Sequence, residues 1–175
     1  QEDFEKGLDV LLTDIQRIPP SSVDPTIKNY HWMDLVTGML NAYEKGNDTA
    51  ILVDENNNIT EGPGFNIFCV HESRIFTPNH GVLEGITRQT VFDLANELNL
   101  SISKQSISVK DLQSASEIFA TSTAGGIMPI TKVNGNPISI GKVGNITRQF
   151  HKLYWEKHSD ENWSESLTSV LNINS

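Results

Sequence analysis

Residues 60–66 have the sequence Thr60-Glu61-Gly62-Pro63-Gly64-Phe65-Asn66, a glycine-rich turn that joins two apolar parts of the chain. Segments 50–53 and 65–70 predict strands, because each is short, apolar and rich in β-branched or aromatic residues. The polar segment 54–58 predicts a turn after the first of them. A sheet is therefore expected at the centre of the fold.

Amphipathic helices are predicted on both sides of this turn. In 31–45 the apolar residues recur at spacings of three and four, so a helix is expected there, with Lys28 just before its start. A second helix is predicted over 87–98, with Thr87 as its N-cap, and a third over 145–157.

The rest of the chain predicts more strands. They are expected at 8–12, 74–76, 101–106, 117–121, 127–133 and 137–138, with a short helical turn at 110–113. Asn134-Gly135 is a strong hairpin signal between the last two. Because strands and helices alternate irregularly, the fold class is α/β or α+β with one main core.

Composition narrows the function classes. The 175 residues are 37% hydrophobic, and 13 basic against 22 acidic side chains give a net charge of −9. This charge disfavours binding to nucleic acid or to an anionic membrane. With a single cysteine, Cys69, no internal disulfide forms, and no apolar run is long enough to span a bilayer. The histidine spacing argues against a zinc site, and a cytoplasmic location is expected.

Lys28 is the candidate nucleophile. A single lysine is usually a solvated surface charge, and that alternative is favoured for Lys28 taken alone. Its neighbours Ile27, Tyr30 and Trp32 are apolar or aromatic, however, and a desolvated setting would lower the pKa of the amine. An amine of this kind forms Schiff bases and moves protons as a general base and acid.

Three further segments complete a candidate site. Glu61 is either a solvated loop carboxylate or the acid partner of a pyridinium nitrogen. Ile86 and Thr87 open the second predicted helix, whose free amides favour a phosphate. The turn Ser122-Thr123-Ala124-Gly125-Gly126 adds hydroxyls and a possible amide nest. Singly these signals are weak, but together they predict a site for pyridoxal 5'-phosphate.

The ordered set of these motifs, from about Ser21 to His158, resembles the class IV (fold-type IV) pyridoxal-phosphate aminotransferases. This group includes branched-chain and D-amino acid aminotransferases and aminodeoxychorismate lyase. Lys28-Asn29-Tyr30-His31-Trp32, residues 61–67 and residues 123–130 look most similar to the (R)-selective amine transaminases. The resemblance implies a mixed-sheet pseudo-barrel flanked by helices.

The resemblance also implies roles for individual residues. Lys28 would be the Schiff-base lysine and Glu61 the pyridinium partner. The expected phosphate ligands are Ile86, Thr87, Ser122 and Thr123, and the expected substrate-side residues are Trp32, Pro63 and Ala124. The implied reaction is amino transfer between a small-molecule amine or amino acid and a keto acid, in a homodimer.

The resemblance further implies a domain division. Family members carry about another domain before this lysine, including an arginine that binds the phosphate. Residues 1–20, with Pro19-Pro20, are therefore expected to be the end of a preceding region and an interdomain linker, and 21–175 the large C-terminal domain. Beyond His158 the tail is polar apart from Trp163, Leu167 and Leu171, which would allow one more helix to dock. Two alternatives remain: a lyase of the aminodeoxychorismate type, and a folded fragment without catalysis.

Overall fold

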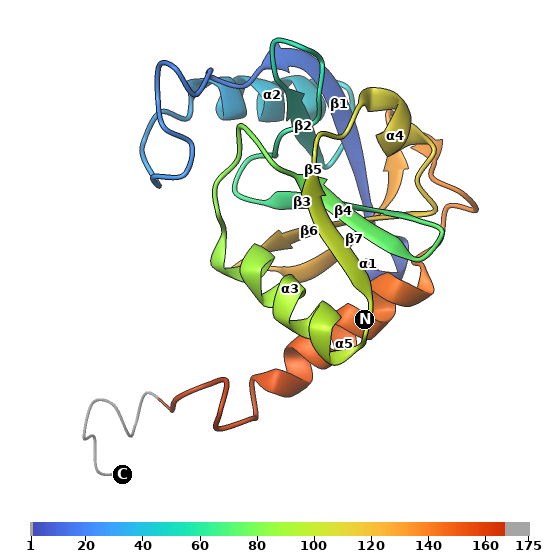
Figure 1. The fold of residues 1–175 in the computed structure, drawn as a ribbon. Coiled ribbons are helices and arrows are strands. Elements are labelled where there is room, and N and C mark those ends of the chain that lie inside the picture. The colour runs from blue at the N-terminus through green and yellow to red at the C-terminus, as the bar shows by residue number, and fades with distance from the viewer. Residues whose placement is uncertain (1, 167–175) are drawn as a thin grey trace.

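A mixed β-sheet forms the body of the molecule in the computed structural model, which describes residues 2–166 (Figure 1). Its main strands follow the order β2-β1-β7-β6-β3-β4-β5, and β8 pairs with β7. The strands are β1 (Leu8–Gln16), β2 (Thr49–Val53), β3 (Asn66–His71), β4 (Arg74–Pro78), β5 (Ser101–Gln105), β6 (Glu117–Ser122), β7 (Gly126–Val133) and β8 (Asn136–Pro137).

Parallel and antiparallel pairs occur in the same sheet. β1 is parallel to both β2 and β7, and β4 is parallel to β5. β3 is antiparallel to β4 and β6, and β6 is antiparallel to β7. Side chains from five of these strands meet in one buried cluster that includes Val10, Ile51, Ile67, Ile118 and Ile130. The sheet therefore curves around this cluster, in agreement with the predicted pseudo-barrel.

Five helices pack against the sheet within residues 2–166, and one of them, α4, adds Leu112 to the cluster inside it. They are α1 (Glu2–Lys6), α2 (Met33–Glu44), α3 (Ile86–Glu97), α4 (Val109–Gln113) and α5 (Asn145–Lys157). In Figure 1, α2 lies beside β1 and β2, while α3 and α5 lie together at the opposite end of the body. α2 buries Leu35 and Ala42 against Leu11 and Leu52. Both α3 and α5 pack on a second cluster, where Phe68 and Phe119 stack with ring centroids 4.9 Å apart.

The predicted elements are confirmed with small shifts in their ends. The hairpin forms at Asn134 and Gly135, where both φ angles are positive, at 53° and 75°, as a two-residue type I′ turn requires. Cys69 is buried in β3, as expected from its place in an apolar strand. No helix within residues 2–166 has the length and apolar content needed to cross a membrane.

Three expectations need comment. The strand predicted at 8–12 is confirmed and extends to Gln16 as β1, which hydrogen-bonds to β2 and β7 inside the sheet, and the domain division at residue 20 stays a prediction. Thr87 is not a helix cap, because Gly85 occupies the N-cap and Thr87 lies buried in the first turn of α3. In the tail, the ammonium of Lys157 lies over the ring of Trp163, 5.0 Å from its centroid, whereas Leu167 and Leu171 lie outside the described residues.

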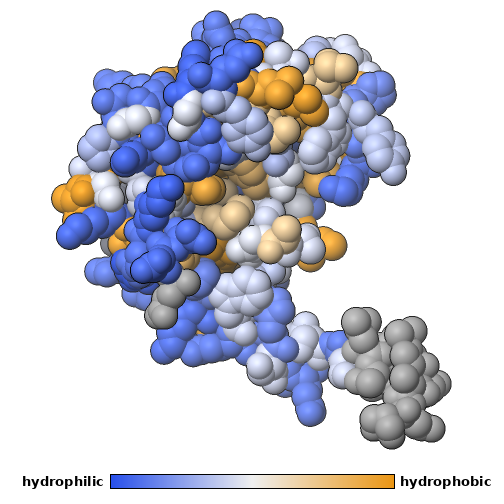
Figure 2. All heavy atoms as spheres, turned by 180° about the vertical axis from the view of Figure 1, so that it is seen from behind, coloured by the Kyte–Doolittle hydropathy of each residue, from blue (hydrophilic) through white to orange (hydrophobic). Residues whose placement is uncertain are grey.

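The surface is mainly hydrophilic, as the charge of −9 implies. The view from behind in Figure 2 shows hydrophobic side chains as separate areas within this surface. Several large apolar side chains near the start of α2 are exposed, among them Ile27 at 63%, Met33 at 78% and Tyr30 with its whole side chain in solvent.

Candidate active site

A cavity of about 410 Å³ opens where five separate segments of the chain converge. These segments are the end of β1, the loop 25–32, the turn 61–66, the loop 83–85 with the first turn of α3, and the end of β6. Seven of the nine residues predicted for the site line this cavity: Lys28, Trp32, Glu61, Ile86, Thr87, Ser122 and Thr123. Pro63 and Ala124 are not among the lining residues.

Glu61 is the buried carboxylate of the cavity, with 5% of the residue exposed. Its Oε1 accepts a hydrogen bond from Arg17 Nε at 3.1 Å, and its Oε2 accepts one from the Leu83 amide at 2.9 Å. Asn66 Nδ2 approaches the same Oε2 at 3.4 Å. Burial raises the pKa of Glu61, and the Leu83 amide and the Arg17 guanidinium act in the opposite direction. Of the two readings of Glu61, the solvated loop carboxylate is therefore wrong.

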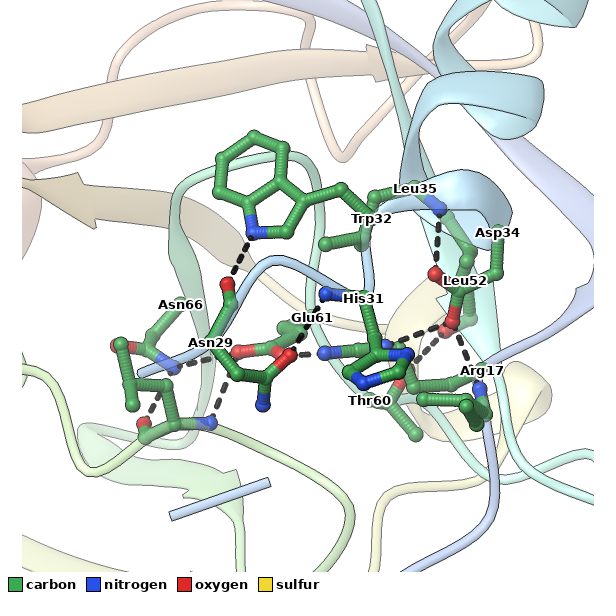
Figure 3. A network of polar contacts seen from close by, with 12 residues as sticks. Arg17, Asn29, His31, Trp32, Asp34, Leu35, Leu52, Thr60, Glu61 and Asn66 are labelled. Carbon is green, nitrogen blue, oxygen red and sulfur yellow. Dashed lines mark hydrogen bonds and ion pairs between the residues drawn. The ribbon is translucent and has the colours of Figure 1, made fainter. Parts of the chain in front are cut away.

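Arg17 is a residue of the cavity that the sequence analysis did not predict. Its guanidinium lies between two carboxylates, with Nε on Glu61 and NH1 on Asp34 Oδ2 at 2.7 Å (Figure 3). Asp34 Oδ2 also accepts the Ile18 amide at 2.7 Å. The arginine follows a strand directly and precedes two prolines, so the sequence suggested a linker. Only the pairing of β1 with β2 carries it to the cavity wall.

Lys28 lies in the loop before α2 and lines the cavity, but its side chain is exposed. The predicted desolvated setting is not found, because Ile27 and Tyr30 point into solvent instead of covering the amine. Nearby, the loop is held by local bonds: Trp32 Nε1 donates to the Asn29 carbonyl at 3.1 Å, and the His31 amide donates to Asn29 Oδ1 at 2.9 Å (Figure 3).

The first turn of α3 faces the same cavity. Gly85 is its N-cap with no side-chain cap, so the turn presents backbone amides to the cavity. A Cβ on Gly85 would lie 2.4 Å from Asn66 Oδ1, so only glycine lets the helix start this close to β3. Such a helix start favours an anion.

Arg88, one turn further along α3, fixes this helix start. Its buried guanidinium donates to Thr77 Oγ1 at 3.2 Å, to Glu84 Oε2 at 2.5 Å and to the Pro78 carbonyl at 2.6 Å. Burial lowers the pKa of Arg88, and Glu84 opposes this shift. Because these bonds join α3 to the end of β4 and to the loop before α3, Arg88 holds this wall of the cavity in place.

The end of β6 supplies hydroxyl groups. Ser122 Oγ accepts the Gly125 amide at 2.9 Å, which closes the predicted turn. Thr123 is exposed at the cavity mouth, and Ser122 is half-buried. The described part of the chain, residues 2–166, contains no group of three or more His, Cys, Asp or Glu side chains arranged to hold a metal ion.

The chain is similar in sequence and in structure to known proteins. The family model for amino-transferase class IV matches residues 1–133. The branched-chain-amino-acid aminotransferase of Escherichia coli is 31% identical over 159 residues, which are 88% of this chain and 51% of that protein. A likeness to two solved structures extends this result. A structure of the E. coli branched-chain aminotransferase superposes with a TM-score of 0.86 at 28% identity, over 94% of this chain and 55% of that one.

The second structure is the branched-chain aminotransferase from Thermobaculum terrenum in its PLP form, with a TM-score of 0.85 at 28% identity, over 91% of this chain and 55% of that one. These proteins are named branched-chain aminotransferases, so the finer resemblance to (R)-selective amine transaminases stays a prediction. The chain spans about half the length of these relatives. Because the family model covers most of its residues, the chain belongs to the class IV aminotransferase family.

Proposed function

We propose that this chain carries the cofactor site of a pyridoxal-phosphate-dependent aminotransferase. The observation that supports the proposal is the convergence of Lys28, Glu61 and the start of α3 on one cavity of about 410 Å³. These segments are far apart in the sequence. Because they share one cavity, a single ligand bound there would contact the amine, the carboxylate and the anion-binding turn. In this proposal the acceptor is a keto acid and the donor an amino acid or amine.

The donor set of the cavity fits this cofactor. When bound, pyridoxal phosphate supplies an electron sink for the electron pair that stays on the substrate carbon when its proton is removed. Lys28 would provide the amine that holds the cofactor aldehyde and that later takes and returns this proton. Glu61, held by Arg17 and the Leu83 amide, would keep a proton on the ring nitrogen. Thr87 and Ser122, with the amides of α3, would hold the phosphate.

The family also supports an assembly of two chains. Ile27, Tyr30 and Met33 expose apolar surface next to the cavity, and such surface favours association. We infer that a homodimer buries this region and shields Lys28 from water. Shielding of this kind would supply the desolvation that the single chain does not give Lys28.

Cofactor attachment tests the proposal directly. The protein is incubated with pyridoxal phosphate, reduced with borohydride and digested, and the peptides are analysed by mass spectrometry. The phosphopyridoxyl group is expected on Lys28 and is lost in Lys28→Ala. Lys45→Ala is the matched control, because Lys45 is an exposed lysine at the end of α2 and lies outside the cavity lining. Labelling spread equally over several surface lysines would refute the site.

A second measurement separates transfer from elimination. An aminotransferase releases at most one equivalent of keto product per site without a keto acid acceptor and needs the acceptor for repeated turnover. A lyase of the aminodeoxychorismate type releases pyruvate over many turnovers without one. We expect dependence on the acceptor. Attachment at Lys28 with neither activity would identify a chain that binds the cofactor without catalysing either reaction.

A further inference from the structure

Thr121, in β6, has a buried hydroxyl group that the fold does not use. Only 2% of the residue is exposed, and Oγ1 has no hydrogen-bond partner within residues 2–166. Other buried threonines of the sheet region differ: Thr77 Oγ1 donates to the Ile67 carbonyl at 2.7 Å, and Thr131 Oγ1 donates to the Lys6 carbonyl at 2.7 Å. Because a buried polar group without a partner costs stability, such a group requires an explanation.

The position of Thr121 suggests the explanation. Thr121 lines the cavity beside Ser122 and Thr123. It is the cross-strand partner of Asn66, and Asn66 Oδ1 lies against Gly85 at the start of α3. Thr121 and the start of α3 line the same cavity, and the side-chain amide of Asn66 is already engaged by Glu61 and by the Leu83 carbonyl at 2.9 Å.

We propose that the Thr121 hydroxyl is a ligand-binding group of this cavity and donates its hydrogen bond to the phosphate of the bound cofactor. This inference rests on the proposed function and adds a residue to it. The helix start provides amides for an anion, and Thr121 provides a fixed donor from the neighbouring strand. A hydroxyl on a buried strand is held in place by the sheet, so the bond costs little side-chain entropy.

The test uses a pair of variants. Thr121→Val removes the hydroxyl and keeps the shape, and Thr121→Ser keeps the hydroxyl. We expect Thr121→Val to weaken pyridoxal phosphate binding by about 5- to 10-fold, the effect of one hydrogen bond, and Thr121→Ser to stay near the wild type. The thermal midpoint of the cofactor-free Thr121→Val protein should be equal to or above that of the wild type, because an unmatched polar group is removed.

Two ligands locate the contact. Pyridoxal, which has no phosphate, should bind the wild type and Thr121→Val equally, and inorganic phosphate should stabilise the wild type more than the variant against heat. Equal loss of pyridoxal binding would overturn the phosphate assignment. Unchanged pyridoxal phosphate binding in Thr121→Val, with Lys28 labelled as expected in the wild type, would overturn the role of Thr121 alone. If the wild type binds no pyridoxal phosphate, both proposals fail.

Discussion

Arg17 Nε donates to Glu61 Oε1 at 3.1 Å, and the same guanidinium donates from NH1 to Asp34 at 2.7 Å. All three side chains are largely withdrawn from solvent. The bond between Arg17 and Glu61 connects the end of β1 to the turn 61–66. The orientation of Glu61 therefore depends on a strand that precedes it by more than forty residues.

Arg17→Met is expected to destabilise the protein by about 3–5 kcal/mol, because two buried carboxylates lose their common partner. Urea unfolding followed by circular dichroism measures this loss. Arg148→Met is the control, since Arg148 pairs with Glu5 at the surface and its removal should leave the midpoint nearly unchanged. Equal effects of the two substitutions would contradict a structural role for the Arg17–Glu61 contact.

The free energy of unfolding is expected to depend on pH through Glu61. Burial raises its pKa above the ordinary value of 4.5, so the folded chain holds this proton at a pH where the unfolded chain has released it. The stability from this group is fully present below 4.5 and is lost as the pH rises through the folded pKa. The free energy of unfolding of the wild type minus that of Glu61→Gln should therefore fall with rising pH. If this difference increased with pH instead, the pKa of Glu61 would be lowered in the folded chain, and the prediction would be wrong.

Cys69 is expected to be unreactive in the folded protein. Its pKa is raised because it is fully buried, and the thiolate is the reactive form. At about pH 8, Ellman's reagent should label it only after unfolding in urea. Ser106→Cys, which adds a thiol at an exposed position, is the control for accessible reaction. Rapid labelling of Cys69 in the native wild type would show that β3 opens locally.

Gly62 next to Glu61 is expected not to tolerate a side chain. A Cβ there would lie 2.5 Å from the Ala50 carbonyl oxygen and 2.1 Å from the Phe65 ring. Gly62→Ala should cost about 1–3 kcal/mol in urea unfolding and weaken pyridoxal phosphate binding, because the turn that holds Glu61 must move. Gly46→Ala is a comparison: it adds backbone strain at φ 80° but meets no atom within 4 Å, so cofactor binding should be unchanged.

The sequence by itself determined the elements and the list of chemical groups. Hydrophobic periodicity and Asn134-Gly135 are local signals, and the helices and the hairpin form where those signals occur. The ordered motifs around Lys28, Glu61 and Thr87 also predicted the family, because motif order is a property of the chain alone.

Tertiary structure alone decided which polar groups have partners. The nearby Pro19-Pro20 indicated a linker at Arg17, because a sequence pattern reports only neighbours along the chain. The contact of Arg17 with Glu61 depends instead on the pairing of β1 with β2. The exposure of Lys28 and the burial of Thr121 depend likewise on which distant segments cover them. Burial and hydrogen-bond partners arise from packing between segments that are distant in the sequence. A sequence pattern therefore indicates which chemical groups are present, but only the folded structure determines their burial and their partners.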